Sequence, residues 1–353
     1  MMRLLVCGGA GFIGTNFVYY MLDAHPEITI VVYDKLTYAG NLENLASLFQ
    51  DERHHFVRGD ITDLPHLSAT IVEHDISHII NFAAETHVDR SIHESTKEFV
   101  LTNTLGVQMI LEAVRLHAIS KFINISTDEV YGSLQLYEDA GFTEHTPIMP
   151  NMPYAAAKAG GDLMCNAYWM THKVPVIVTH CSNNYGPYQF PEKLIPFFVF
   201  KLLKNEKVPI YGDGQNVRDW IHVHDHVRAL DLLLHHGQPG EVYNIGANNE
   251  RSNLEITRLL LSLLDLGEEQ VEYVTDRPGH DRRYAIDASK LARLGWKPDY
   301  PREKFVQGLQ ETIEWYKSNT AWVEHIWQKK RGEMNSFQAT LRRSNEKMQA
   351  ASP

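Results

Sequence analysis

The segment Ile125–Gly132, ISTDEVYG, places Asp128 and Glu129 directly after KFINIS, an apolar run that predicts a buried strand. Two carboxylates in this position form either a solvated loop or an acid and base at the carboxyl end of a strand, where parallel sheets carry their sites. Further along, Tyr154 and Lys158 in PYAAAKAGGD are four residues apart, which places both on one face of a helix. An ammonium beside a phenol favours the phenolate, the form in which tyrosine can act as a base. This spacing also occurs in ordinary amphipathic helices, so the pair needs support from its surroundings.

A glycine-rich loop near the N-terminus gives that support. VCGGAGFIGTNF carries Gly8, Gly11 and Gly14 between a predicted strand and a predicted helix. Without a Cβ the backbone can approach a pyrophosphate, and the helix N-terminus offers free N–H groups. Asp34 ends the next predicted strand about 20 residues beyond the last glycine, where a carboxylate binds a ribose diol and repels a 2′-phosphate. A glycine-rich turn alone would be weak evidence, but together with Asp34 it predicts NAD rather than NADP.

The elements around these residues alternate between strand and helix. Apolar runs predict strands at RLLVCG, TIVVYD, HHFVRGD, ISHIINFAA and KFINIS, and amphipathic runs predict helices at Phe12–Ala24, Leu42–Gln50, Leu64–His74, Ser95–His117, Leu194–Leu203, Asp225–His236 and Ser252–Leu264. This order indicates an α/β fold, a Rossmann-type doubly wound parallel sheet with a smaller mixed C-terminal lobe. We predict an NAD-binding domain at 1–182 that shares elements with a substrate-binding lobe at 183–331, and a polar tail at 332–353 that is a frayed helix or disordered.

Composition excludes several other classes of protein. The 353 residues are 44% hydrophobic and 22% charged, with a net charge of −11, which argues against nucleic acid as the main partner. Three widely spaced cysteines, Cys7, Cys165 and Cys181, fit a reduced cytoplasmic protein without disulfides. The N-terminus shows no signal peptide, and no apolar run in the sequence approaches the length of a membrane span.

A histidine-rich segment, IHVHDHV, could suggest a metal site at His222, His224 and His226. The segment reads as a strand that continues into a helix, which would separate the three side chains. We therefore assign no metal there, and interpret Asp225 as a residue near the helix start, where a carboxylate favours the dipole.

Several long motifs together resemble the dTDP-glucose 4,6-dehydratases, a nucleotide-sugar dehydratase branch of the extended short-chain dehydrogenase/reductase superfamily. They are GGAGFIG, DKLTYAGNLENL, FAAETHVDRSI, STDEVYG, YAAAKAGGD, CSNNYGPYQFPEKLIP, YGDGQNVRDWIHV and DRPGHDRRYAID. The resemblance implies an NAD-dependent lyase that converts dTDP-glucose to dTDP-4-keto-6-deoxyglucose for deoxysugar biosynthesis, rhamnose included. It also implies a cytoplasmic homodimer paired through a four-helix bundle. The alternatives are a UDP-glucose 4,6-dehydratase, a nucleotide-sugar 4-epimerase and a non-enzymatic NAD sensor.

The resemblance also assigns roles to residues of this chain. Tyr154 would be the base at the C4 hydroxyl with Lys158 as its helper, Thr127 would bond the C4 oxygen, Asp128 would protonate the departing C6 hydroxyl, and Glu129 would take the C5 proton. The implied cofactor residues, beyond Gly8, Gly11 and Gly14, are Phe12, Ile13, Asp34, Lys35, Leu36, Thr37, Asp60, Ile61, Ala83, Ala84, Thr102 and Asn184, with Tyr154 and Lys158. The implied substrate residues are Thr86, Asn183, Lys193, Leu194, Pro209, Ile210, Tyr211, Arg218, Asn253, Asp276, Arg277 and His280.

The chain departs from the usual pattern of this family in two places. Thr86 stands where serine is usual, which keeps the hydroxyl and adds a methyl group. The tail after Trp327 has no recognised counterpart. Lys193 and Arg218 are cations in loops of an otherwise acidic protein, as a diphosphate requires, whereas we interpret Lys201 and Lys204 as solvated surface charge.

Overall fold

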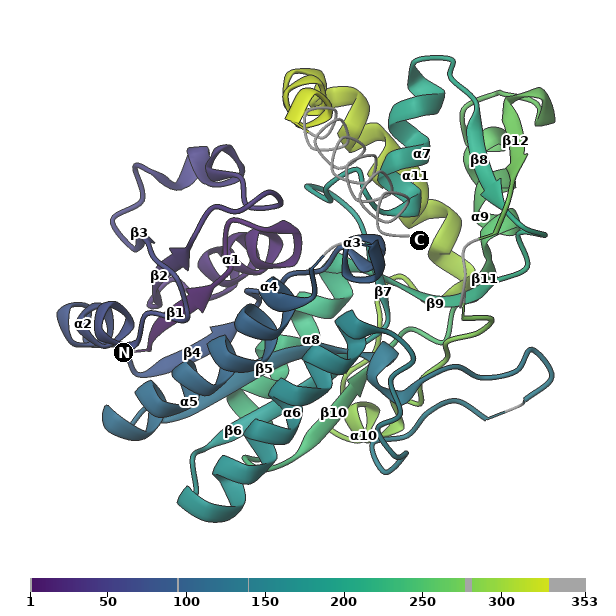
Figure 1. Cartoon of the computed structure of the whole chain (residues 1–353). Coiled ribbons are helices and arrows are strands. Elements are labelled where there is room, and N and C mark those ends of the chain that lie inside the picture. Colours follow the sequence, from purple (N-terminus) through teal and green to yellow (C-terminus); the bar gives the residue numbers. More distant parts are fainter. Residues whose placement is uncertain (1, 94, 139, 277–280, 330–353) are drawn as a thin grey trace, which may run out of the picture.

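The computed structural model describes residues 2–93, 95–138, 140–276 and 281–329. Within these ranges the first layer is a seven-stranded sheet in the order β10-β6-β5-β4-β1-β2-β3, in which all neighbouring strands are parallel (Figure 1). From β3 to β6 this is the strand order of a Rossmann sheet, which confirms the predicted fold class. The strands are β1 (Arg3–Cys7), β2 (Thr29–Asp34), β3 (His54–Arg58), β4 (His78–Asn81), β5 (Lys121–Thr127), β6 (Val176–Cys181) and β10 (Val242–Ile245).

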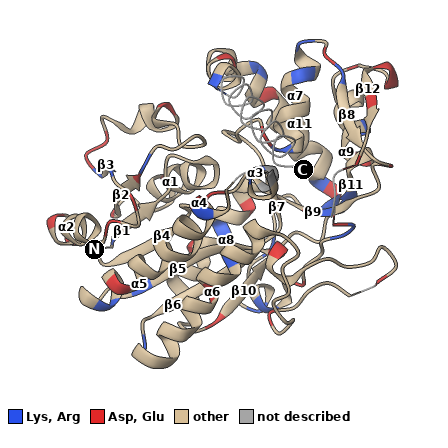
Figure 2. Cartoon of the chain, viewed as in Figure 1, with Lys and Arg blue, Asp and Glu red and all other residues tan. Residues whose placement is uncertain are grey.

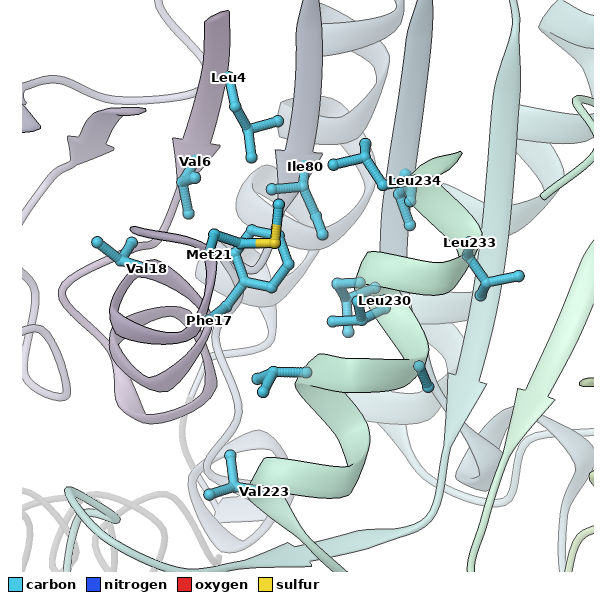
Figure 3. Close-up of a cluster of buried hydrophobic side chains, with 14 of the residues drawn as sticks. Leu4, Val6, Phe17, Val18, Met21, Ile80, Val223, Leu230, Leu233 and Leu234 are labelled. Atoms are coloured by element: carbon cyan, nitrogen blue, oxygen red, sulfur yellow. The ribbon is translucent and has the colours of Figure 1, made fainter. Parts of the chain in front are cut away.

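Helices cover both faces of the sheet because its central strands are apolar on both sides. On one face, Phe17 and Met21 pack with Leu230 against Leu4 and Ile80, all fully buried (Figure 3). The helices of that face are α1 (Phe12–Ala24) and α8 (Val223–His236). The opposite face is covered by α2 (Leu64–Glu73), α5 (Val107–Leu116) and α6 (Pro153–His172).

The helix predicted at Ser95–His117 forms as three consecutive segments, which are α4 (Lys97–Val100), the π-helical turn η2 (Leu101–Gly106) and α5. A short helix, α3 (Val88–His93), precedes it. By length and composition alone, Lys97–Leu116 would suffice to cross a membrane. Its packing against α6 and α2 instead makes it a core helix of the first layer.

One predicted element differs in kind. Leu42–Gln50 was expected as an α-helix, but the chain forms a 3₁₀ helix, η1 (Leu42–Leu48). The Asn41 side chain caps its start by accepting the Glu43 N–H at 3.3 Å. Asn44, inside the turn, donates to Ala10 O at 3.1 Å and so ties η1 to the glycine-rich loop. This contact with a distant part of the chain could not be read from local periodicity.

The second lobe contains two small sheets and three main helices around its own core. The three-stranded sheet has the mixed order β11-β9-β7, and β12 pairs with β8. The strands are β7 (Asn183–Tyr185), β8 (Val208–Tyr211), β9 (Val217–His222), β11 (Glu250–Ser252) and β12 (Val271–Val274). The helices are α7 (Leu194–Leu203), α9 (Asn253–Leu263) and α11 (Phe305–Ser318), with short turns η3 (Asp128–Tyr131), η4 (Glu268–Gln270), η5 (Arg302–Lys304) and α10 (Ser289–Ala292) elsewhere in the chain.

The chain crosses between the two lobes more than once. After β7, β8 and β9 it returns to supply α8 and the edge strand β10 to the first layer (Figure 1). The division at residue 182 therefore stays a prediction. Acidic and basic residues are interspersed over both lobes in the view of Figure 2. The predicted tail at 332–353 lies outside the described residues.

The last described helix joins the lobes a further time. Residues 320–329 are helical and reach back to the loop that follows β2. Trp322 Nε1 donates to Asn44 Oδ1 at 2.8 Å, and Lys329 Nζ donates to Gly40 O at 3.0 Å. Residues 320–329 thus hold a loop that lies within the first 50 residues of the sequence.

Candidate active site

The glycine-rich loop forms a close turn between β1 and α1. Gly8 has a φ of +75°, and a Cβ on it would lie 2.4 Å from Ala83 N. A Cβ on Gly14 would lie 2.4 Å from Gly8 O, so the first turn of α1 packs directly on the loop. Gly11 occupies the N-cap of α1, and no side chain caps this helix start or places an acid in its first turn. The N–H groups of Phe12 and Ile13 therefore stand at a positive helix end that suits a pyrophosphate.

Asp34 lies beside this loop at the end of β2. Its Oδ2 accepts the Ala10 N–H at 3.0 Å and its Oδ1 accepts the Leu36 N–H at 2.8 Å. Burial raises the pKa of Asp34, while these two N–H groups and the Lys329 charge oppose the rise. The carboxylate thus fixes the loop against β2 and remains able to accept further hydrogen bonds from a ribose diol.

The other predicted cofactor residues lie at neighbouring strand ends. Lys35 Nζ pairs with Asp60 Oδ2 at 2.7 Å, next to Thr37 and the buried Ile61. Ala83 and Ala84 follow β4, and Thr102 lies in the π-helical turn η2, a geometry that often marks functional sites. Asn184 lies on β7, where its Oδ1 bonds His226 Nδ1 at 2.9 Å. These positions fit a dinucleotide along the carboxyl edge of the sheet.

The predicted catalytic residues meet where β5 ends and α6 begins. Thr127 is the last residue of β5, and its hydroxyl accepts the Glu129 N–H at 3.3 Å, which starts η3. Tyr154 lies in the first turn of α6 and is buried, and the Thr127 side chain acts to lower its pKa. One turn later, Lys158 Nζ donates to Ile125 O at 2.5 Å. The structure therefore brings Thr127, Tyr154 and Lys158 to one place.

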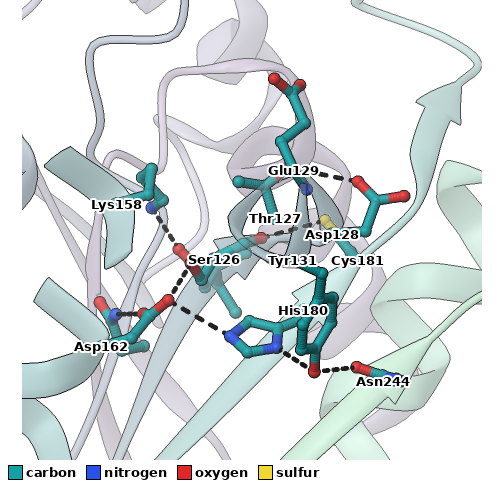
Figure 4. A network of polar contacts seen from close by, with 12 residues as sticks. Ser126, Thr127, Asp128, Glu129, Tyr131, Lys158, Asp162, His180, Cys181 and Asn244 are labelled. Atoms are coloured by element: carbon teal, nitrogen blue, oxygen red, sulfur yellow. Dashed lines mark hydrogen bonds and ion pairs between the residues drawn. The ribbon is translucent and has the colours of Figure 1, made fainter. Parts of the chain in front are cut away.

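The two carboxylates of the acidic pair have different environments. Asp128 is 1% exposed, Thr127 donates to its Oδ1 at 3.4 Å, and its Oδ2 has no hydrogen-bond partner among the described residues. Burial first, then the charges of Glu129 and Asp219, raise the pKa of Asp128 well above its usual range. This environment favours the protonated, uncharged form of Asp128. The Glu129 side chain is only partly buried and extends away from the buried polar groups (Figure 4).

Burial also acts on the tyrosine and the lysine. It raises the pKa of Tyr154 well above the usual value, and the carboxylates of Glu129 and Asp128 add to the rise. Burial lowers the pKa of Lys158, while the Asp162 carboxylate opposes the change. A further positive charge beside the phenol is therefore needed before Tyr154 can work as a base.

The predicted substrate residues line the second lobe opposite this edge, with some exceptions. Lys193 precedes α7 and donates through Nζ to Thr86 O at 2.9 Å, which joins the lobes. Arg218 on β9 is buried, its guanidinium lies 4.3 Å from the centre of the Tyr284 ring, and its charge opposes the raised pKa of Asp128. Asn183 on β7, Leu194 on α7 and Asn253 at the start of α9 belong to the same lobe.

Two groups of these residues need separate comment. On β8, Tyr211 is 45% exposed. The neighbouring Ile210, which follows Pro209, is 1% exposed and belongs to the hydrophobic core. Ile210 can therefore contact a ligand only through its backbone. Asp276 lies just after β12, whereas Arg277 and His280 lie outside the described residues.

The histidine-rich segment runs from strand into helix as predicted. β9 ends at His222, whose Nδ1 accepts the His224 N–H at 3.2 Å and caps α8. His226 faces Asn184, so the three side chains do not converge. The carboxylate of Asp225, in the first turn of α8, accepts the N–H groups of Asp299 and Tyr300 at 2.6 and 2.9 Å. Asp225 therefore also holds the loop at Asp299 and Tyr300, a contact that the local sequence does not indicate.

A second histidine cluster lies at the opposite end of α8. His25 Nε2 and His235 Nδ1 both contact Asp231 Oδ1, at 2.9 and 3.1 Å. The two imidazole rings stack at 5.1 Å with an interplanar angle of 27°. His235 Nδ1 also hydrogen-bonds the backbone O of Asp231 at 3.0 Å. Hydrogen bonds to Asp231 explain this cluster.

Sequence reasoning missed a group of buried polar residues behind Lys158. Asp162 on α6, His180 on β6, Tyr131 in η3 and Asn244 on β10 form a connected network (Figure 4). Asp162 lies four residues after Lys158, a spacing that could have drawn attention to it. The other members are brought there by sheet order, which the sequence does not specify directly.

Comparison with known proteins identifies the family. A model of the family described as GDP-mannose 4,6 dehydratase matches residues 5–311. A dTDP-glucose 4,6-dehydratase of an Actinoplanes species is 49% identical over 327 residues, or 91% of this chain and 99% of the relative. The crystal structure of dTDP-glucose 4,6-dehydratase from Bacillus anthracis in complex with NAD is 48% identical, has a TM-score of 0.86, and covers 92% of this chain and 100% of its own.

A second crystal structure agrees with the first. The dTDP-glucose 4,6-dehydratase from Streptomyces venezuelae, with NAD bound, is 46% identical with a TM-score of 0.87, and the match covers 92% of this chain and 100% of the other. The Rossmann sheet with its Tyr–Lys helix thus defines an extended short-chain dehydrogenase/reductase of the nucleotide-sugar dehydratase type. Within that class, the chain belongs to the dTDP-glucose 4,6-dehydratase family.

Proposed function

We propose that this protein is an NAD-dependent lyase that dehydrates dTDP-glucose to dTDP-4-keto-6-deoxyglucose. One observation carries the proposal most directly. A buried Asp128 with a raised pKa and a partly buried Glu129 lie beside the Tyr154–Lys158 pair. Oxidation and reduction need only the hydroxyls and the lysine, whereas loss of water also needs an acid and a base, and this pair provides them.

The residues of the first layer fit NAD. The glycine-rich loop has no space for a Cβ at Gly8 or Gly14. Asp34 lies beside this loop, in a position suited to accept hydrogen bonds from an adenosine ribose. When bound, NAD would supply the hydride acceptor for C4 of the sugar and the hydride donor for C6, and its oxidised form would add positive charge to the site. Because the reaction has no net redox change, we expect the cofactor to stay bound through purification.

Tyr154, Lys158 and Thr127 act at the C4 oxygen. Tyr154 removes the proton of the C4 hydroxyl, and the buried Lys158 cation stabilises the phenolate that this requires. Thr127, whose side chain acts to lower the pKa of Tyr154, holds the same oxygen. Once C4 is a ketone, the hydrogen at C5 is acidic because it lies next to a carbonyl.

Glu129 and Asp128 then act at C5 and C6. Glu129 takes the C5 proton, and Asp128 protonates the departing C6 hydroxyl, so that water leaves. The environment of Asp128 suits this role, because burial raises its pKa and so favours the form that carries the proton, whereas the Glu129 side chain is only partly buried. The Asp128 Oδ2, without a partner among the described residues, is able to bond a substrate hydroxyl.

The second lobe supplies the groups for the nucleotide. Lys193 and Arg218 are cations suited to a diphosphate, and Lys193 is already fixed by Thr86 O. The side chains or backbone of Asn183, Leu194, Pro209, Ile210, Tyr211, Asn253 and Asp276 would surround the remaining parts of the substrate. We infer a preference for the thymine base from family membership, and the first assay therefore compares dTDP-, UDP- and GDP-sugars.

Isotope transfer tests the proposal. With dTDP-glucose carrying deuterium at C4, the label should reappear at C6 of the product, and solvent hydrogen should enter at C5, as read by NMR and mass spectrometry. Label found back at C4 would indicate an epimerase. Label lost to solvent, or no release of water from any of the three sugars, would also refute the dehydratase.

We further propose a cytoplasmic homodimer paired through α5 and α6. These helices pack together on the outside of the sheet, and both expose large apolar side chains. Leu116 and Leu163 are each 57% exposed and Met170 is 62% exposed. Exposed apolar side chains on two adjoining helices favour a partner, and a second copy supplies the same helices.

A further inference from the structure

A line of buried polar side chains crosses four neighbouring strands behind the Tyr–Lys pair. Asn81 on β4 is aligned with Asn124 on β5, and Asn244 on β10 is aligned with His180 on β6. Asp162 projects from α6 between the two halves and contacts both Asn124 and His180. All five residues are at most 5% exposed. Burying a polar side chain without a hydrogen-bond partner lowers the stability of the folded state. A buried polar line of this length therefore requires that its members be paired with one another.

One end of the line determines the state of Asp162. The backbone N–H of Ala83 donates to Asn81 Oδ1 at 3.1 Å, so the Asn81 amide group donates to Asn124 Oδ1 at 3.0 Å. The Asn124 amide therefore donates to Asp162 Oδ1 at 3.3 Å. The Ser126 hydroxyl donates to Asp162 Oδ2 at 2.6 Å. Asp162 meets donors on both oxygens, which is the environment of an ionised carboxylate.

The other end determines the proton on His180 Nδ1. The backbone O of Phe142 accepts the Asn244 amide at 2.9 Å, so Asn244 presents Oδ1 to Tyr131. Tyr131 has one hydroxyl proton and donates it to that oxygen at 2.9 Å. The Tyr131 oxygen must then accept from His180 Nδ1, which lies 2.6 Å away. Both ends of the line are backbone groups, whose donor or acceptor character is fixed.

The two ends meet at His180. Its Nε2 lies 3.2 Å from Asp162 Oδ2, an acceptor, so this nitrogen also needs a proton. We propose that His180 is an imidazolium ion that forms a buried ion pair with Asp162, and that this pair acts as a positioning unit for Lys158. The role of the unit in catalysis rests on the proposed dehydratase function, whereas the protonation state does not.

The ion pair affects Lys158 through charge. Lys158 and Asp162 are four residues apart on α6, and the Asp162 carboxylate helps to keep the buried Lys158 protonated. An uncompensated carboxylate would also cancel the field that Lys158 exerts on Tyr154. The His180 cation prevents this, because one carboxylate between two cations leaves a net positive charge beneath the phenol. The unit therefore favours the Tyr154 phenolate.

Other titratable groups around His180 are consistent with this arrangement. Burial raises the pKa of Tyr131 first, and the charges of Glu144, Asp162 and Asp128 add to the rise, so Tyr131 stays a phenol. The Glu144 carboxylate accepts the Asn244 N–H at 3.0 Å. Cys165 on α6 is fully buried near Asp162, and its pKa is raised well above the usual value, so it stays a thiol.

Nitrogen NMR of the histidine side chains tests the protonation state without substrate. The His180 resonances are assigned as those lost in His180→Gln. At neutral pH both ring nitrogens of His180 should carry protons and show imidazolium shifts. One unprotonated ring nitrogen would overturn the proposal, whatever the activity of the protein.

Kinetics test the positioning role. His180→Gln removes the cation but can still hydrogen-bond, whereas His180→Arg keeps a positive charge. In His180→Gln the acidic limb of the kcat–pH profile should move to higher pH by about one unit. At a given pH on that limb, kcat should be about tenfold lower, with KM unchanged. His180→Arg should restore the limb toward wild type. The exposed His145→Gln serves as the control for loss of a histidine.

Two results would contradict the positioning role. One is a His180→Gln profile identical to that of wild type, and the other is an equal loss in His180→Gln and His180→Arg without any shift of the limb. If His180→Gln fails to fold, Tyr131→Phe gives the histidine assignment instead, because it should shift only the His180 Nδ1 signal. A protein with imidazolium shifts but no dehydratase activity would refute the proposed function and leave the ion pair intact.

Discussion

Replacing Asp128 with asparagine tests the proposed acid. Asp128 is 1% exposed and accepts the Thr127 hydroxyl through Oδ1 at 3.4 Å. Asparagine has nearly the same shape and accepts the same hydrogen bond, so the variant loses little more than the acidic proton. We expect kcat to fall about 10²–10⁴-fold, or roughly 3–5 kcal/mol in the barrier at about 1.36 kcal/mol per tenfold. KM should change little, because the lost interaction belongs to the transition state.

Stability gives Asp128→Asn a second, independent readout. The raised pKa of Asp128 means that the folded state holds this proton more tightly than the unfolded state does. Its contribution to stability is therefore full at low pH and is lost as the pH rises from about 3.9, the unfolded value, toward the raised folded value. Asparagine cannot ionise. The variant should match wild type near the low end of this window and gain relative stability as the pH rises.

The assay combines product mass spectrometry with urea unfolding at several pH values. Asp23→Asn, on the exposed face of α1, is the matched control and should change neither readout. A loss in kcat of less than tenfold would refute Asp128 as the acid. A variant that is less stable than wild type at neutral pH would refute the neutral, buried carboxyl on which the assignment depends.

Three further perturbations test other parts of the structure. Gly14→Ala would place a Cβ 2.4 Å from Gly8 O, so we expect a cost of about 1–3 kcal/mol and less NAD released on denaturing the purified protein than from wild type. Lys121→Met removes an ammonium that caps α8 at Leu234 O and Gly237 O, at 2.7 and 3.1 Å, and should lower the free energy of unfolding in urea by about 1–3 kcal/mol. Leu163→Glu with Met170→Glu should give a light-scattering mass near the 40.4 kDa of one chain, and an unchanged dimer would exclude this face.

The sequence predicted well the strands and helices that have a regular apolar pattern. Continuous apolar runs marked β1 to β5, and α1 and α7 begin and end at the predicted residues, Phe12–Ala24 and Leu194–Leu203. These elements are specified locally, by periodicity and by the glycines and polar residues at their ends. The glycine-rich loop, Asp34 and the Tyr–Lys spacing were equally visible, because each depends on residues that are close in sequence.

Features that depend on distant contacts were not predictable in this way. The 3₁₀ form of Leu42–Leu48 follows from the contact of Asn44 with Ala10 O. The burial of Ile210 in the core of the second lobe follows from tertiary packing. His180 lies beside Asp162 because α6 packs on the neighbouring strands β5 and β6, an arrangement that no local pattern encodes. Chemistry that spans several strands becomes visible only once the sheet is assembled.

The edge strand β10 has a consequence for how the protein can be divided and made. A fragment ending at residue 182 would contain the whole predicted cofactor loop but would leave the backbone edge of β6 without its partner. Such bare edges pair with other chains and aggregate. During synthesis the same edge stays open until residues 242–245 emerge. The nucleotide-binding half is therefore not a portable module, and attempts to express it alone or to exchange it between relatives should carry α8 and β10 with it.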